Sequence, residues 1–275
     1  MDETKSAIAV MFSGGTDSTF AALSQIPHYD RIHLVTFYRH GLRKSQNTRE
    51  AVDRLKGAFS DKDVRYHEVD FEDIYRMITP RKQKLDVQIA VLSQEIEPLW
   101  NNSSNRESGE RDFAADKQRL FLANECLQCK IAMDLAAIKF CLENGIAFIC
   151  DGSNTEQLDD GSQLEDVKQI AQQIFKRFDI RYFSPVFHVS AEKRGKALYE
   201  VGITDHIDHK RLEKTHQIPS RQIQCTVPAS VLWTTCIFPW LVYDGDSCND
   251  YIQMSCWYFK ERMESGLKMM GLTEG

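Results

Sequence analysis

Ser13-Gly14-Gly15-Thr16-Asp17-Ser18 is the stretch that decides the fold, because it joins an apolar run at residues 8–12 to a helical stretch at 19–25. A buried strand that ends in two glycines lets the backbone turn tightly, so that successive N–H groups and the helix start face an anion. The hydroxyl groups of the stretch add further donors. No lysine follows the glycines as in G-x-x-x-x-G-K-[ST], which excludes that type of phosphate loop. The stretch therefore predicts a phosphate-binding turn.

The composition is that of an ordinary globular chain, with 275 residues of which 42% are hydrophobic and 27% charged. The net charge of -6 gives no general attraction to nucleic acid or anionic membrane, so that contact with RNA would need a local basic patch. The polar N-terminus and the lack of a spanning apolar segment predict a cytoplasmic protein without a membrane partner. The apolar stretch at 227–243 suits buried core or a homodimer contact.

Alternating strand and helix signals predict an α/β fold, a doubly wound parallel five-stranded sheet with helices on both faces. We place the domain boundary between residues 200 and 201, so that a cysteine-containing helical extension covers 201–275. The expected strands cover residues 8–12, 31–38, 64–69, 146–150 and 181–186, and the expected helices cover 19–25, 47–59, 129–144, 164–178, 191–201 and 205–216.

The S-G-G-x-D-S pattern at 13–18 resembles the PP-loop of the ATP pyrophosphatase superfamily, whose members have an adenine nucleotide alpha-hydrolase-like, Rossmann-like fold. Members of this superfamily cleave ATP between the α- and β-phosphates. The resemblance covers residues 7–200 and implies that residues 13–18 of this chain bind the pyrophosphate part of ATP. It makes 1–200 a PP-loop ATP-binding domain.

Two further segments match the order of motifs in this superfamily. Thr36 and Phe37, at the end of the second expected strand, lie where relatives bind adenine, largely through backbone groups and an apolar wall. Core packing in the strand explains the same residues equally well. The D-G-S-N segment at 151–154 resembles the G-x-N segment that faces the nucleotide, which implies that Gly152 and Asn154 contact ATP.

Charged residues near these motifs are expected to handle magnesium and phosphate. Magnesium prefers hard oxygen ligands, so we expect Asp17 to bind Mg²⁺ together with Asp159 or Asp160, although a solvated acidic turn competes for the last two. Lys193 follows a Ser-Pro pair as in the family's P-L-x(n)-K element, and the resemblance implies a catalytic lysine at the α-phosphate. A surface lysine is the alternative.

The pair Cys126 and Cys129 forms a C-x-x-C motif at the start of the long expected helix. In a chain without an export signal, such a pair indicates metal, cluster or redox chemistry. PP-loop tRNA thiolases carry C-x-x-C at the same place, and add a third cysteine downstream that completes the ligands of a [4Fe-4S] cluster. This resemblance implies Cys126, Cys129 and Cys225 as cluster ligands, and the assignment of Cys225 rests on its distance along the chain from Cys126.

Two other uses of the cysteines stay open. The C-x-x-C thiols could accept a persulfide as catalytic nucleophiles, since a helix N-terminus lowers the pKa of a thiol. Alternatively, the C-terminal cysteines could bind Zn²⁺, as they do in 7-cyano-7-deazaguanine synthases, but they lack the C-x-x-C spacing of a zinc ribbon. The four cysteines concerned are Cys225, Cys236, Cys248 and Cys256.

Together these motifs predict an enzyme that adenylates a carbonyl or carboxylate oxygen, releases pyrophosphate, and then transfers sulfur from a donor. The acceptor is a small molecule or a tRNA. One alternative is a PP-loop ligase that forms an amide or nitrile on a small molecule. Another is a nucleotide-binding partner without catalysis.

Overall fold

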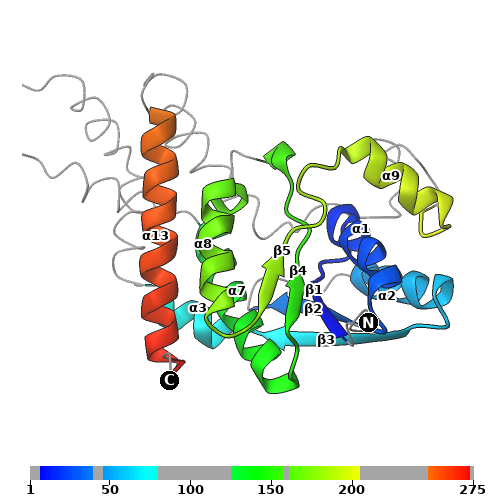
Figure 1. The fold of residues 1–275 in the computed structure, drawn as a ribbon, viewed down its shortest axis with the longest axis horizontal. Coiled ribbons are helices and arrows are strands. Elements are labelled where there is room, and N and C mark those ends of the chain that lie inside the picture. Colours follow the sequence, from blue (N-terminus) through cyan, green and yellow to red (C-terminus); the bar gives the residue numbers. More distant parts are fainter. Residues whose placement is uncertain (1–6, 40–45, 80–124, 158–160, 205–246, 273–275) are drawn as a thin grey trace, which may run out of the picture.

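The computed structural model describes residues 7–39, 46–79, 125–157, 161–204 and 247–272. Within them, five parallel strands form one sheet in the order β3-β2-β1-β4-β5 (Figure 1). The predicted α/β fold with a five-stranded parallel sheet is confirmed, and all five strands overlap their expected ranges. The strands are β1 (Ala7–Met11), β2 (Arg31–Tyr38), β3 (Asp63–Asp70), β4 (Phe148–Cys150) and β5 (Arg181–Phe183).

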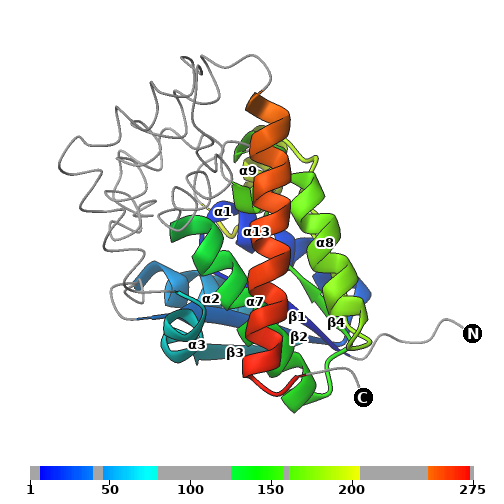
Figure 2. The ribbon, with the colours of Figure 1, turned by 90° about the vertical axis from the view of Figure 1, so that its left-hand side faces the viewer.

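Helices cover both faces of the sheet (Figures 1 and 2). One face carries α1 (Thr16–Gln25), α2 (Gln46–Ala58) and α9 (Ala191–Glu200), whose apolar residues form one core with the sheet. The other face carries α3 (Glu72–Ile78), α7 (Glu125–Asn144), α8 (Glu165–Lys176) and α13 (Ser247–Met269), which form a second core. The described segments also contain three short 3₁₀ turns, η1 (Ile26–His28), η2 (Thr155–Gln157) and η3 (Gly161–Gln163).

The sheet is apolar on both faces because helices cover both of them. Ile8, Ala9 and Val10 of β1 are fully buried although they point alternately to the two sides. Such a run carries no alternation, and its length and flanking glycines mark it as a strand.

Helix α13 is the last described helix, within the range predicted as a C-terminal extension, and it packs against α3, α7 and α8 (Figure 2). Its apolar residues Tyr258, Phe259, Met263 and Leu267 belong to the same core as those of α7. The helix expected over 205–216 and the apolar stretch at 227–243 lie outside the described residues. No helix among the described segments is long and apolar enough to cross a membrane.

The strand order reverses between β1 and β4. From β1 the chain continues outward to β2 and β3, whereas β4 pairs with the opposite side of β1 and leads to β5. In open parallel sheets, ligands bind at such a reversal, outside the carboxyl ends of the strands. The loop at 13–18 follows β1 and the segment at 151–154 follows β4, so both predicted nucleotide segments lie at this point.

Candidate functional site

The loop between β1 and α1 is closed by its own hydroxyl groups. The Ser13 backbone N–H donates to Ser18 Oγ at 3.2 Å, and Ser18 Oγ donates to the Gly15 carbonyl at 3.1 Å. The Gly15 N–H donates to Ser13 Oγ at 3.3 Å. Gly15 is the N-cap residue of α1 and no side chain caps the helix there. The first N–H groups of α1 can therefore donate to an anion, as the sequence predicts.

Gly14 is required by both its conformation and its surroundings. Its φ of +79° lies in the region that side chains disfavour, and a Cβ there would stand 2.6 Å from Thr48 Cα. Thr48, at the start of α2, also donates its hydroxyl to the Ser13 carbonyl at 2.8 Å. Helix α2 thus holds the loop from one side.

The segment after β4 holds the loop from the other side. A Cβ on Gly152 would stand 2.6 Å from Ser18 N and 2.8 Å from Asp17 C, so only glycine allows this approach. Asn154 Nδ2 donates to Asp17 Oδ2 at 3.0 Å. Asn154 is buried, whereas the side chain of Asp17 is 28% exposed. The two segments that the sequence assigns to ATP are therefore in direct contact.

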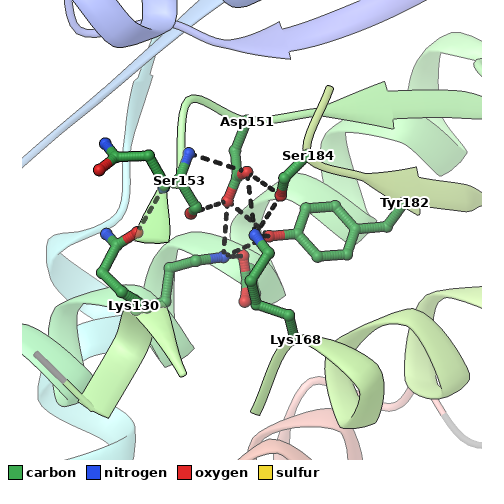
Figure 3. A network of polar contacts seen from close by, with 9 residues as sticks. Lys130, Asp151, Ser153, Lys168, Tyr182 and Ser184 are labelled. Atoms are coloured by element: carbon green, nitrogen blue, oxygen red, sulfur yellow. Dashed lines mark hydrogen bonds and ion pairs between the residues drawn. The ribbon is translucent and has the colours of Figure 1, made fainter. Parts of the chain in front are cut away.

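A buried polar network surrounds Asp151, the first residue after β4 (Figure 3). Its carboxylate accepts from Tyr182 Oη at 2.5 Å, from Lys168 Nζ at 3.2 Å, and from the Ser184 hydroxyl. It also accepts from the Ser153 N–H at 3.2 Å and from Ser153 Oγ at 2.7 Å. The network fixes the turn that places Gly152 on the loop.

Two lysines compensate the charge of Asp151. Burial alone would raise the pKa of this carboxyl, but Lys168, Lys130 and its hydroxyl donors outweigh burial and hold its pKa well below its usual range. Burial lowers the pKa of Lys168, and Asp151 offsets part of that effect. Lys130 Nζ lies 2.5 Å from Asp134 Oδ1 and 3.7 Å from Asp151 Oδ2. Asp151 is therefore a charged carboxylate although it is buried.

The thiol pair lies at the same edge of the sheet. Helix α7 starts at Glu125, earlier than the expected 129, so Cys126 and Cys129 lie in its first turns and share a face. Cys126 is half-buried and Cys129 is buried. The next residue, Lys130, reaches Asp151, which brings the start of α7 to the segment that contacts the loop.

The ligand sets that the resemblance implies are present only in part among the described residues. Two thiols on one helix face fit two positions of a cluster, whereas Cys225 lies outside the described residues. The described segments contain no group of three His, Cys, Asp or Glu residues that could hold a metal ion. The partly exposed carboxylate of Asp17 fits a magnesium ion near the loop, and Asp159 and Asp160 lie outside the described residues.

The zinc alternative has one described cysteine, Cys256, which is half-buried on α13. Among the described residues, it belongs to no group of three side chains that could hold a metal ion. Cys225 and Cys236 lie outside the described residues, and the side chain of Cys248 is not described.

Three other predicted residues have different surroundings. The Thr36 hydroxyl donates to the Phe12 carbonyl at 2.6 Å, so that it ties β2 to β1, and Phe37 packs against the core on the α7 face. Lys193 is exposed in the first turn of α9, where its N–H donates to Ser190 Oγ at 3.4 Å. The buried cation is its neighbour Arg194, whose Nε lies 2.8 Å from Asp17 Oδ1.

Sequence reasoning missed Arg194, Lys168 and Asp134. Lysine and arginine are rarely buried without a partner, so a helix with charges in several positions reads as a solvated face. The signal that was available is the periodicity of α8, where Lys168 lies on the same face as Ala171 and Phe175.

Comparison with known families finds no match, and none of the curated proteins compared matches. Solved structures do match. One is a 4-thiouridine synthetase in complex with RNA and ATP, with 14% identity over 96% of this chain and a TM-score of 0.47. Another is the U34-tRNA thiolase NcsA from Methanococcus maripaludis with its [4Fe-4S] cluster, with 13% identity over 97% of this chain and a TM-score of 0.35.

This chain spans 54% of the synthetase chain and 74% of the thiolase chain. Both proteins are thiouridine or tRNA thiolation enzymes, the group that the sequence motifs resemble. Both identities and both TM-scores are low, however, so these likenesses decide nothing about the chemistry of this chain.

Proposed function

We propose that this chain is an ATP-dependent enzyme that adenylates an acceptor oxygen and then replaces that oxygen with sulfur. The observation that carries the proposal is the contact between the 13–18 loop and Gly152 at the reversal point of the sheet. The N–H groups at the start of α1, where no side chain caps the helix, and the exposed hydroxyl of Ser13 can bind the pyrophosphate part of ATP there.

In the first step, the acceptor oxygen attacks the α-phosphorus of ATP and the bond to the β-phosphate oxygen breaks, with pyrophosphate as leaving group. The loop holds the pyrophosphate as charge develops on it. Asp17 would hold Mg²⁺, which neutralises the phosphates when bound. In the second step, a sulfur nucleophile attacks the activated carbon and AMP leaves with the oxygen.

The thiols supply the reason to choose sulfur over nitrogen as the nucleophile. Cys126 and Cys129 stand one turn apart at the edge where the loop lies, and a C-x-x-C pair of this kind suits a reducing compartment such as the cytoplasm. The proposed cluster ligands are Cys126, Cys129 and Cys225. When bound, a cluster with one open iron supplies a site that carries sulfur.

The acceptor class is tested with both candidates, a tRNA and a small carbonyl compound. The two structural matches are an RNA complex and a tRNA thiolase, whereas the net charge of -6 favours a small molecule.

The test is product analysis after anaerobic purification. We expect ATP, Mg²⁺, acceptor and sulfide to give AMP and pyrophosphate in equal amounts, together with thiolated acceptor. Asp17→Asn should abolish pyrophosphate release, because it removes the carboxylate at the loop. Cys126→Ser should leave pyrophosphate release but abolish thiolation. Lys139→Gln, an exposed change on the same helix as Cys126, is the matched control.

Each possible product pattern decides between the candidate functions. ADP and orthophosphate as products would overturn the proposal. Pyrophosphate release with ammonia as the productive nucleophile, and no effect of Cys126→Ser, would favour the amide- or nitrile-forming ligase. Nucleotide binding without any turnover would leave a nucleotide-binding partner.

A further inference from the structure

Four residues form a closed ring of polar contacts beside the loop at 13–18. Arg194 Nε lies 2.8 Å from Asp17 Oδ1, and Arg194 Nη2 donates to Glu156 Oε2 at 2.8 Å. The Glu156 N–H donates to Asn154 Oδ1 at 3.0 Å, and Asn154 Nδ2 returns to Asp17 Oδ2 at 3.0 Å. The ring joins the start of α1 to α9 and to the segment after β4.

Arg194 is the cation of this ring, and 2% of its side chain is exposed. Its Nη1 donates to the Val189 carbonyl, just before α9. Glu156 in turn accepts from the Ala191 N–H at 3.0 Å, so the start of α9 is held from two sides. A buried guanidinium with a planar set of donors is well suited to hold two carboxylates in a fixed geometry.

The charge of Asp17 conflicts with the proposed use of the loop. Asp17 is in the first turn of α1, directly beside the N–H groups that would bind pyrophosphate. An unpaired carboxylate at this place would repel the triphosphate of ATP, and the repulsion is strong where water is partly excluded. The ion pair with Arg194 removes most of that repulsion before any metal ion arrives.

We infer that Arg194 is a positioning residue that neutralises Asp17 and so lets the loop accept the phosphates of ATP. This inference rests on the proposed function. It assigns the cation that acts at the loop to the buried Arg194 instead of the exposed Lys193. Arg194 acts through Asp17 rather than on the phosphates, and this separates it from a lysine that contacts the α-phosphate.

A double-mutant cycle on Asp17 and Arg194 tests the inference, with ATP affinity measured by calorimetry in EDTA and again with Mg²⁺. We expect Arg194→Gln to weaken ATP binding about tenfold in EDTA, and less with Mg²⁺, because the metal ion then neutralises Asp17. Adding Asp17→Asn to Arg194→Gln should restore most of the affinity in EDTA, because it removes the unpaired charge. Lys196→Gln, an exposed change on α9, is the matched control.

Two further variants keep the test decisive if Arg194→Gln does not fold. Arg194→Lys keeps the charge and should bind ATP nearly as well as the parent chain. Asp17→Asn alone should bind ATP in EDTA at least as tightly as the parent, because a cation is then left beside the phosphates. If affinity in EDTA is too weak to measure, the Mg²⁺ concentration at half-maximal ATP binding gives the same comparison.

The outcomes separate this inference from the proposed function. A parent chain that binds no ATP with Mg²⁺ overturns both. Normal ATP binding by Arg194→Gln overturns only the role of Arg194. Weaker binding that Asp17→Asn fails to restore shows that the ring is a scaffold and that its charge balance is irrelevant, which also overturns the inference.

Discussion

Gly14 and Gly152 are the residues at which one added methyl group should have the clearest effect on ATP binding. In both cases the new Cβ would stand 2.6 Å from a backbone atom, which cannot move without shifting the loop at 13–18. We expect Gly14→Ala and Gly152→Ala each to weaken ATP binding about a hundredfold, because small misplacements of binding groups have large effects. Calorimetry with ATP and Mg²⁺ measures the change.

Gly57 provides the matched control for these two glycines. It lies on the exposed side of α2 and has nothing within 4 Å of its ideal Cβ. Gly57→Ala should bind ATP like the parent chain and be slightly more stable. Normal ATP binding by Gly152→Ala would mean that the segment after β4 does not hold the loop.

Protonation of one residue, His33, should have a measurable effect on how the stability of the fold depends on pH. Burial lowers its pKa to about 4, helped by His67, Arg65 and Arg31 and opposed by Asp63. The unfolded chain, with an ordinary histidine pKa, therefore binds more protons between pH 6.5 and 4. Stability is full above that range and decreases by about 3 kcal/mol as the pH falls through it.

His33→Phe should flatten this part of the stability curve, because phenylalanine keeps an aromatic ring beside His67 but cannot be protonated. The ring centroids of His33 and His67 lie 5.0 Å apart. Urea denaturation at several pH values between 4 and 7 measures the slope. An unchanged slope would mean that His33 is protonated in the folded chain.

Among the elements, β4 and α8 depend on the buried charges that they share. Lys168 of α8 and Asp151 after β4 are both almost fully buried, so removing Lys168 leaves the buried carboxylate with Lys130 as its remaining cation. Lys168→Met should reduce the free energy of unfolding by about 3 kcal/mol. Lys139→Met breaks an exposed pair with Glu143 on α7 and should change it by less than about 0.5 kcal/mol.

Denaturant titration of both lysine variants gives the comparison. Asp151→Asn combined with Lys168→Met should recover part of the loss, since it removes the buried carboxylate that has lost its nearer lysine. Equal effects of Lys168→Met and Lys139→Met would show that the network adds nothing to stability.

The elements themselves were largely predictable from the sequence. The range expected for β2 agrees with the structure, because its apolar run is bounded by polar residues on both sides. Strand β5 ends at Phe183, earlier than the expected 186, because the chain turns once Ser184 reaches Asp151. Helix α7 begins at Glu125, earlier than the expected 129, and its first turn places Leu127 in the core.

The candidate site was predictable only where a motif marks backbone geometry. The loop at 13–18 and Gly152 follow from glycine spacing, and their contact follows from the strand order. Arg194 and Lys168 could not be found in the same way, because the partner of a buried cation is fixed by tertiary packing and lies far away in sequence. The roles of Lys193, Thr36 and Phe37 in nucleotide binding stay predictions.

At the scale of the whole molecule, α13 makes the C-terminal segment part of the core. Gly266 lets α13 approach α7 and α3, since a Cβ there would stand 2.3 Å from Leu135 Cδ1 and 3.3 Å from Ile78 Cγ2. Gly266→Leu should lower the free energy of unfolding by about 2 kcal/mol, because the larger side chain overfills this contact. The division of the chain between residues 200 and 201 stays a prediction.

Thermal unfolding of Gly266→Leu measures this effect, with Gln253→Leu on the exposed side of α13 as the control. The control should stay within about 0.5 kcal/mol of the parent. Equal melting temperatures for the two variants would mean that α13 is held only loosely on the sheet.

The pairing of β1 with β4 has a consequence for how the chain is made. The loop at 13–18 leaves the ribosome early in synthesis. Strand β4, which pairs with β1 on the side opposite β2, follows only when residues 148–150 emerge. A half-made chain therefore lacks one side of the proposed nucleotide site, and closing the centre of the sheet is a long-range folding event that is expected to be slow.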